Sequence, residues 1–363
     1  MPTGYLWSYC YCIISIMLLK QIILRNFRNF SGEKFNFNPF LTIIIGENSR
    51  GKTNLLEAIY LTTQGEGFRE SREDELIKFE QNQSEIQGNF GKGDESFRFQ
   101  IVIKRTPGGV DKIFSINLAR RKYFQFQKET AKTVLFSPEQ IEIMTGPPDR
   151  RRKYFNNLLG SFDLVYKKNL INYENALRRR NKILEKPKSE SDMRDELTYW
   201  NLYLEEQAHY LTSNRQEYVD FLNAHNRVNS KEFLIEYLKD EFNKKRLEES
   251  FEREKWYRKT VIGPQKDDFQ INQKNESAKN LHHFGSRSEQ RLAIFWLKFN
   301  EIKYLEEKFK NRPLLLLDDV FSELDVKNKK LIIDLVKKYQ TVVTTTEIEL
   351  LELADVPKSI IKL

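Results

Sequence analysis

"LTIIIGENSRGKTNLLEAIY", Leu41–Tyr60, is the stretch of the sequence that decides the fold. It begins with a short apolar run typical of a buried strand and continues into a loop bounded by Gly46 and Gly51. After the loop, apolar residues recur at three- and four-residue spacing, which is typical of a helix with a buried face. The stretch therefore predicts a strand, a tight loop and a helix in direct succession.

The loop has the composition of a phosphate-binding loop, because "GENSRGKT" fills every fixed position of the pattern G-x-x-x-x-G-K-[ST]. Its glycines let backbone N–H groups turn toward phosphates, and the positive end of the following helix points at the same anion. Lys52 is expected to pair with the β- and γ-phosphates, and the Thr53 hydroxyl to bind Mg²⁺. We therefore predict a site for ATP and Mg²⁺ formed by Gly46, Glu47, Asn48, Ser49, Arg50, Gly51, Lys52 and Thr53.

A second acidic element follows in "RPLLLLDDVFSELD". Its four leucines indicate a buried strand, and Asp318 at the strand's end is placed to hold Mg²⁺ through water. Asp319 is the candidate for polarising the attacking water, so both aspartates are predicted to be catalytic. A guanine-nucleotide switch protein would need an N-K-x-D motif near the end of the chain. The sequence has no such motif, which disfavours that class.

A third element is "FGSRSEQRLAIFWLKFNEIKYLEE", in which a serine-rich turn precedes a long amphipathic helix. Ser286 lies near the predicted helix start, where backbone N–H groups can take a phosphate. The chain thus has two helix starts suited to phosphate. Either they converge on one nucleotide within a subunit, or each subunit of a dimer covers the nucleotide held by its partner.

Charge-laced helical patterns run from about residue 163 to 184 and from 193 to 226, separated by "KPKSESD". They predict a helical hairpin whose longer arm spans roughly 50 Å. Strand patterns return in "KEFLIEYL", "PLLLLDD" and "QTVVTTTE". We therefore predict an α/β fold, a P-loop NTPase head with a mixed sheet and an inserted α-helical subdomain. The predicted ranges are 17–135 and 261–363 for the head, 136–260 for the helical subdomain, and 1–16 for a dispensable extension before Met17.

The net charge of +8 and the pI of about 9.1 favour a polyanionic partner, nucleic acid first. Residues 150–186 contain 11 Lys or Arg against three Asp or Glu. Such runs suit phosphate contacts that do not depend on base sequence, although a charged arm can also be merely solvated. The predicted DNA contacts are Arg150, Arg151, Arg152, Lys153, Arg178, Arg179 and Arg180. A second candidate surface contains Lys104, Arg105, Arg120, Arg121 and Lys122.

With these elements in this order, the chain resembles the ABC-type ATPase heads of the SMC-like class. Within that class it is similar to the RecF family, from Met17 to the C-terminus. The resemblance also rests on "GFRESREDELI", "FSPEQIEIMTGPPDRRRKYFN", "GPQKDDF" and "DDVFSELD". It implies a protein that binds DNA, whether single-stranded, double-stranded or gapped, and forms a homodimer on ATP. Such a protein hydrolyses ATP slowly and works with RecO and RecR to load recombinase at gaps. With Met17 as the start of the chain, we also expect a cytoplasmic location and no membrane partner.

The resemblance also implies roles for individual residues. Lys52 and Thr53 correspond to the Walker A contacts, Asp318 to the Walker B magnesium ligand, and Ser286 to the start of a signature motif that reaches the partner's ATP. Two later segments have expected roles as well: Ser322–Asp325, with Asp325 at the dimer seam, and Thr344–Glu347 near the γ-phosphate.

The sequence departs from the family pattern at three positions. Ser288 and Glu289 stand where the signature usually has Gly-Gln, and Ser49 stands where the loop usually has Gly. A missing glycine restricts close approach of the backbone to phosphate, and a carboxylate near ATP adds repulsion. The alternative function is an SMC-like structural protein that bridges DNA, which needs far longer coiled-coil arms than the predicted hairpin.

Overall fold

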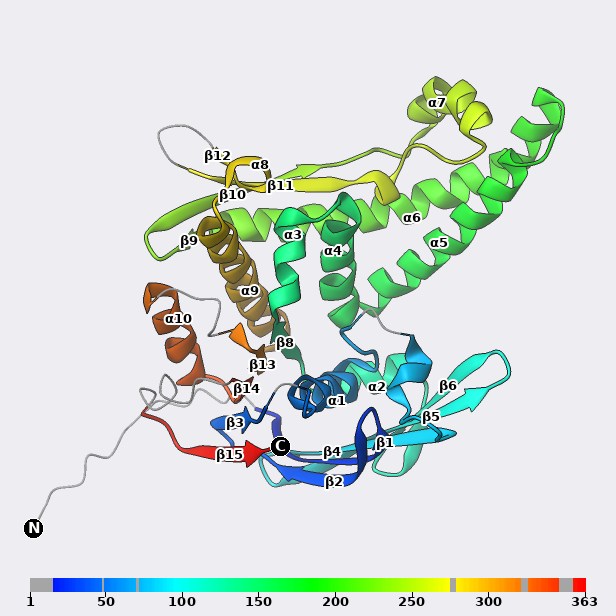
Figure 1. Ribbon diagram of the computed structural model, residues 1–363. Helices are drawn as coiled ribbons and strands as arrows, with labels where there is room; N and C mark the ends of the chain where they lie inside the picture. Colours follow the sequence, from blue (N-terminus) through cyan, green and yellow to red (C-terminus); the bar gives the residue numbers. More distant parts are fainter. Residues whose placement is uncertain (1–15, 48, 70–71, 275–278, 321–325, 346–354) are drawn as a thin grey trace, which may run out of the picture. The chain divides into compact units, whose positions relative to one another are not determined.

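The structure is a computed structural model and describes residues 16–47, 49–69, 72–274, 279–320, 326–345 and 355–363. The chain forms two compact units, one made of residues up to Ser137 together with Ile302–Leu363, the other of Pro138–Glu301. Helix α9 (Arg287–Phe309, Figure 1) contains the boundary between Glu301 and Ile302, so its residues belong to both units. None of the described helices is long and apolar enough to cross a membrane.

The first unit contains a five-stranded parallel sheet with the strand order β15-β3-β14-β13-β8. All five residues of β13 are buried, as the leucine run predicted. Because the strands are parallel, the carboxyl ends of β3, β13 and β14 lie at one edge of the sheet. The strands are β3 (Leu41–Ile45), β8 (Thr133–Phe136), β13 (Leu314–Asp318), β14 (Thr341–Thr344) and β15 (Lys358–Lys362).

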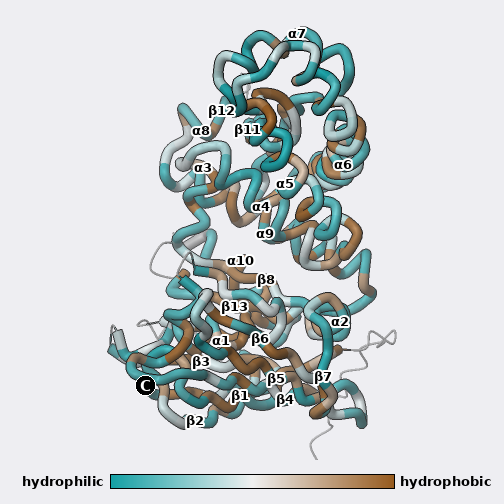
Figure 2. Tube along the Cα trace, turned by 90° about the vertical axis from the view of Figure 1, so that its right-hand side faces the viewer, coloured by the Kyte–Doolittle hydropathy of each residue, from teal (hydrophilic) through white to brown (hydrophobic). Residues whose placement is uncertain are grey.

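A six-stranded antiparallel sheet, in the order β2-β1-β4-β5-β6-β7, completes this unit. Helix α1 (Lys52–Gln64) contacts strands of both sheets, so Leu55, Leu56 and Ile59 are fully buried. Figure 2 shows hydrophobic residues gathered along these strands. The strands are β1 (Leu18–Phe27), β2 (Phe30–Asn36), β4 (Gln83–Lys92), β5 (Glu95–Thr106), β6 (Gly109–Ile116) and β7 (Ala119–Arg121).

The rest of this unit is helical, and one helix corrects a predicted strand. The pattern of "GVDKIFSINLARRKYFQF" predicts hairpin strands throughout, but its last segment, "YFQF", forms α2 (Tyr123–Glu129). Its three-residue spacing puts Phe126 against Phe99 and Phe114 on the sheet, with ring centroids 5.8 and 5.1 Å away. The other elements are η1 (Glu73–Leu76) and α10 (Val326–Val336).

The second unit contains the predicted helical hairpin, formed by the packed helices α5 and α6. Its sheet has the order β12-β11-β10-β9. The helices are η2 (Pro138–Ile141), α3 (Glu142–Thr145), α4 (Pro148–Phe162), α5 (Leu164–Leu184), α6 (Glu190–Ala224), α7 (Lys244–Tyr257), η3 (Pro264–Lys266) and α8 (Leu281–Phe284). The strands are β9 (Arg227–Val228), β10 (Lys231–Leu238), β11 (Asp268–Gln273) and β12 (Lys279–Asn280).

The predicted return to the head at residue 261 is wrong, because residues 261–301 belong to the second unit. Strand β10, the "KEFLIEYL" segment, pairs with β11 rather than joining the parallel sheet. The first half of α9 packs in the same unit, where the Trp296 indole donates to the His225 carbonyl at 2.8 Å and stacks on Phe233. Of the predicted extension 1–16, only residue 16 is described.

Candidate nucleotide site and basic surface

The phosphate-binding loop lies between β3 and α1 and has the backbone conformations that its glycines suggest. Gly51 has φ 109°, and a Cβ there would come within 2.7 Å of the Asn29 amide. Ser49 also adopts a left-handed φ of 68°. Glycine adopts that region most easily, so Ser49 has the backbone conformation that the glycine expected from the family pattern would favour. Of the predicted contacts, Asn48 lies outside the described residues.

Lys52 is folded back over this loop. Its Nζ donates to the carbonyls of Gly46 at 2.6 Å and Glu47 at 3.0 Å. Arg50 pairs with the Glu47 carboxylate at 3.2 Å, and both side chains are exposed. The ammonium is thus held at the centre of the loop, where it can exchange backbone carbonyls for phosphate oxygens.

The structure brings Thr53 and Asp318 together, although 265 positions separate them in the chain. Thr53 Oγ1 donates to Asp318 Oδ1 at 3.1 Å, and Thr344 Oγ1 donates to the same oxygen at 2.7 Å. Thr344 is adjacent because β13 and β14 pair in parallel with Asp318 opposite Thr344. Burial raises the pKa of Asp318, and the two hydroxyl donors act against that rise.

These oxygen donors fit Mg²⁺, which prefers a few protein oxygens together with water and phosphate. A buried carboxylate whose charged form is disfavoured also gains from a nearby cation. Asp319, the second predicted catalytic residue, follows at φ 46°, and its N–H donates to Thr344 Oγ1 at 2.9 Å. Both aspartates therefore lie at the carboxyl edge of the sheet, where Asp318 contacts Thr53.

Arg69 is a residue of this site that the motif analysis did not predict. Its guanidinium donates to Asn54 on α1 at 2.9 Å, and its charge favours the ionised form of Asp318. The Arg69 guanidinium also lies 3.9 Å from the carboxylate of the fully buried Glu57. Arg28 donates two hydrogen bonds to that carboxylate, at 2.9 and 3.1 Å. Arg69 occurs in the quoted "GFRESREDELI" segment, whose position in the family pattern was the available signal.

Ser286 lies in the second unit, immediately before α9, and is exposed. Its N–H and its hydroxyl each donate to Glu289 Oε2 at 2.8 Å, while Glu289 N–H approaches Ser286 Oγ at 3.3 Å. This reciprocal arrangement is a capping box. Lys279 Nζ binds the same carboxylate at 2.8 Å, and together with the Ser286 donors it lowers the pKa of Glu289 to about 2. The unusual Glu289 therefore caps its own helix, and its charge is balanced by Lys279.

Two of the seven predicted DNA contacts are wrong, because their side chains are interior. Arg180 is 1% exposed and bonds Glu254 at 2.7 Å, Thr260 at 2.7 Å and Asn201 at 2.8 Å. Arg151 is also buried, with bonds to both carboxylate oxygens of Asp268 at 2.5 and 3.0 Å. A buried guanidinium that is already paired cannot reach a phosphate in solvent.

The other predicted contacts differ in exposure. Lys153, Arg178 and Arg179 are exposed, and Arg179 lies 5.4 Å from the centroid of the Trp200 ring. Arg150 pairs with Glu142 at 3.0 Å, and Arg152 donates to the Asp267 backbone carbonyl at 2.8 Å. The accessible positive charge of this set therefore lies mainly on α5. Asp325 and Glu347, with predicted roles at the dimer seam and near the γ-phosphate, lie outside the described residues.

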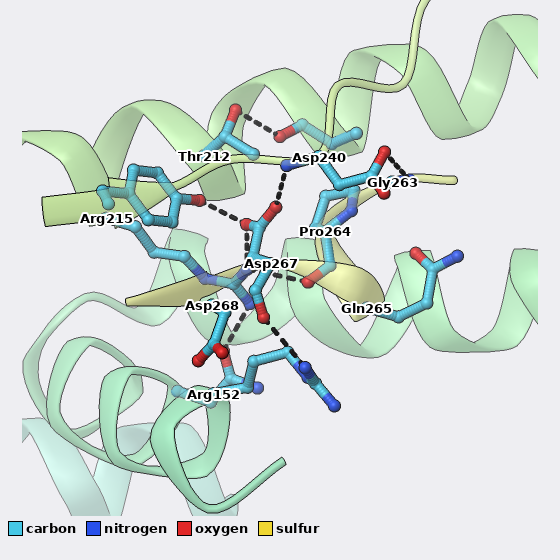
Figure 3. Close-up of polar contacts among 12 residues, drawn as sticks. Arg152, Thr212, Arg215, Asp240, Gly263, Pro264, Gln265, Asp267 and Asp268 are labelled. Carbon is cyan, nitrogen blue, oxygen red and sulfur yellow. Dashed lines mark hydrogen bonds and ion pairs between the residues drawn. The ribbon is translucent and has the colours of Figure 1, made fainter. Parts of the chain in front are cut away.

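The "GPQKDDF" segment forms a buried polar network in the second unit (Figure 3). The Asp267 carboxylate, 1% exposed, accepts from Arg215 at 2.6 Å, from the Tyr237 hydroxyl and from the Asp240 N–H at 2.8 Å. Arg215 also donates to the Pro264 carbonyl at 3.0 Å. The motif thus bonds α6, β10 and the turn before β11 to one another.

Residues 18–362 match the family described as RecF/RecN/SMC N terminal domain. With the Thr53–Asp318 pair at the end of a parallel sheet, this defines the class: a P-loop ATPase head of the RecF/RecN/SMC type. A solved SMC head domain from Pyrococcus yayanosii, 14% identical with a TM-score of 0.51, is similar in fold and covers 96% of this chain and 95% of its own.

A protein named DNA replication and repair protein RecF from Clostridium botulinum (strain Eklund 17B / Type B) is 34% identical over 352 residues, 93% of this chain and 95% of its own. A solved structure described as the recombination mediator protein RecF-ATPrS in the RecFOR pathway has 30% identity and a TM-score of 0.85 over 96% of both chains. The chain belongs to the RecF family.

Proposed function

We propose that the protein is an ATP-dependent DNA-binding protein of replication and recombinational repair, which dimerises on ATP and closes on DNA. The observation that carries the proposal is the meeting of Thr53 with Asp318 at the loop that holds Lys52. It is supported by Ser286, a capped and exposed helix start in the other unit of the chain. A second subunit could present Ser286 to the nucleotide, which makes ATP a link between two copies.

In this proposal each residue of the loop has a defined task. Lys52 leaves the carbonyls of Gly46 and Glu47 and pairs with phosphate oxygens. Thr53 and Asp318 hold Mg²⁺, which when bound neutralises charge on the phosphates. Asp319 orients the attacking water. Because the nucleotide serves as a switch between open and closed dimers, slow hydrolysis is sufficient.

DNA is the proposed partner because Lys153, Arg178 and Arg179 present positive charge to solvent in a chain of net charge +8. RecO and RecR are proposed as protein partners, and the cytoplasm as the location, by family membership. A relative of known structure is described as a recombination mediator in the RecFOR pathway, which supports loading of recombinase at gaps as the role.

The test is the molar mass in solution with and without ATP and Mg²⁺, measured by light scattering. The wild-type protein is expected to double its mass on adding ATP, because each nucleotide bridges two subunits. Lys52→Met is the matched variant and should stay monomeric, since methionine keeps the length of the side chain and removes its charge. A wild-type protein that remains monomeric with bound ATP would refute the dimer mechanism.

A further inference from the structure

The end of helix α7 carries aromatic and basic side chains that the site described above does not use. We name Arg253, Trp256, Tyr257, Arg258 and Lys259 the α7-end surface. All five are exposed, with Trp256 at 83% and Tyr257 at 56%. Tryptophan is usually well buried, so a ring exposed to this degree on a well-formed helix calls for a partner.

These rings are not displaced core residues. Helix α7 buries a separate face, formed by Leu247, Ser250, Phe251 and Glu254. Phe251 packs in an apolar cluster with residues of the α5–α6 hairpin, and Trp256 lies off that buried face. Tyr257 is the last residue of the helix, which ends normally with Arg258 in a left-handed conformation at φ 55°. The helix is therefore complete without burying either ring.

The surface is held rigid by buried bonds on both sides of it. On one side, Glu254 is fully buried and accepts from Arg180 at 2.7 Å and from the Val261 N–H at 3.1 Å. On the other, the Thr260 N–H and hydroxyl both donate to Asn181 on α5, at 2.8 and 2.7 Å. Residues 256–259 lie between these anchors, so little conformational freedom would be lost on binding.

The charges of the surface are uncompensated. Among the described residues, Arg253, Arg258 and Lys259 have no carboxylate within ion-pair distance. Lys255 in the same turn is different, since it pairs with Glu190 at 3.0 Å and Glu252 at 3.1 Å. Three available cations around two exposed aromatic rings are thus complementary to a polyanionic ligand that carries both phosphate groups and flat aromatic rings.

We propose that the α7-end surface binds an unpaired strand of nucleic acid, with bases stacking on Trp256 and Tyr257 and phosphates contacting the three cations. The chemistry favours an unpaired strand because the bases of a duplex are stacked on one another and cannot lie on a protein ring. This inference rests on the proposed function, to which it adds a binding surface and the residues that distinguish an unpaired strand from a duplex.

The first experiment compares two probes at one salt concentration without nucleotide: a fluorescein-labelled oligothymidylate of about 30 nucleotides and a duplex of similar length, followed by anisotropy. Trp256→Ala with Tyr257→Ala should weaken binding of the single strand about tenfold or more, since stacking on one ring is worth about 1–3 kcal/mol per base. Duplex binding should change less than about twofold, because the cations remain. Phe79→Ala is the control, since Phe79 is a similarly exposed ring, at 84%, in the other unit.

A second measurement reads the contact directly. Oligothymidylate should quench the tryptophan fluorescence of the wild type, and Trp256→Phe should abolish most of that quenching while retaining most of the affinity. Arg253→Gln with Lys259→Gln should weaken both probes and reduce the single-strand salt slope by about 1.4, at about 0.7 for each cation.

Equal losses on both probes, or no loss on either, would overturn the inference and leave the surface to a protein partner. Quenching that survives Trp256→Phe would also overturn it. Because binding is read without nucleotide, these results are independent of ATP-driven dimerisation. A wild type that fails to dimerise therefore refutes the proposed function and leaves the stacking test readable.

Discussion

The buried Asp267–Arg215 pair gives the sharpest stability prediction, and the perturbation is Asp267→Asn. Asparagine keeps the shape of the side chain but has one acceptor oxygen where the carboxylate has two. Asp267 Oδ1 accepts the Asp240 N–H, and Oδ2 accepts from Arg215 and Tyr237. The amide group must therefore point its NH₂ at one of these donors, and the Arg215 guanidinium loses its carboxylate partner.

Breaking a buried ion pair by removing one partner costs about 3–5 kcal/mol. Arg215 retains three bonds, to Tyr166 at 3.1 Å, the Pro264 carbonyl at 3.0 Å and Asn156 at 2.9 Å. Because these hydrogen bonds remain, the guanidinium still has polar partners in the variant. The expected loss of unfolding free energy is therefore at the lower end of that range, about 3 kcal/mol. With an urea slope of about 2–3 kcal/mol per M, the unfolding midpoint should fall by about 1 M.

The assay is urea unfolding followed by tryptophan fluorescence, which reports mainly the second unit because three of the four tryptophans, Trp200, Trp256 and Trp296, belong to it. Asp220→Asn on an exposed position of α6 is the matched control and should leave the midpoint unchanged. Adding Arg215→Met to Asp267→Asn should recover about 1–2 kcal/mol relative to the sum of the single losses. A midpoint for Asp267→Asn within about 0.3 M of wild type would refute the reasoning, because the pair would then not be a structural bond.

Three further predictions follow from the described contacts. The pKa of Glu289 is about 2, below the ordinary 4.5, so its ion pair stabilises the fold above about pH 4.5 and is lost as the pH falls toward 2. Glu289→Gln keeps the helix cap and removes the charge, so its melting temperature should fall less than that of the wild type between about pH 5 and pH 2.5. Arg178→Gln with Arg179→Gln should reduce the salt slope of duplex binding by about 1.8, whereas Arg151→Gln should lower the melting temperature and leave that slope unchanged. Asp318→Asn should retain ATP binding, measured by calorimetry. It should slow ATP hydrolysis at least about tenfold, since the carboxylate that fits Mg²⁺ is gone. An unchanged hydrolysis rate would contradict the role of Asp318.

Local patterns predicted the elements that depend on local chemistry. The strand, loop and helix at Leu41–Tyr60 follow from spacing and glycines, and the structure has β3 and α1 there. The placement of Asp318 beside Thr53 also follows, because the carboxyl ends of parallel strands share an edge. The return to the head was misplaced because pairing of β10 with β11 is decided by distant residues, and local alternation does not identify a strand's partner.

The arginine runs on α4 and α5 contain both interior and exposed side chains, and helical periodicity distinguishes them. On α5 the buried residues are Tyr166, Tyr173, Ala176, Arg180 and Leu184, so Arg180 falls on the apolar stripe. On α4, Arg151 is in helical register with the buried Phe155 and Leu158. Helical periodicity therefore separates the interior arginines from the exposed Arg178 and Arg179, whereas counting charges along the sequence does not.

The central claim is that Ser286 acts on the nucleotide held by the other subunit, and mixed dimers test it most directly. Asp318→Asn, which is expected to retain ATP binding, and Ser286→Arg should each lack most of the ATPase activity alone. Mixed in equal amounts, half of the dimers contain one of each subunit, and one of the two composite sites in such a dimer is intact. The account predicts recovery of about a quarter of wild-type activity, as follows for a symmetric two-site dimer. No recovery, with mixed dimers shown to form, would contradict it, because Ser286 would then act within its own subunit or not at all.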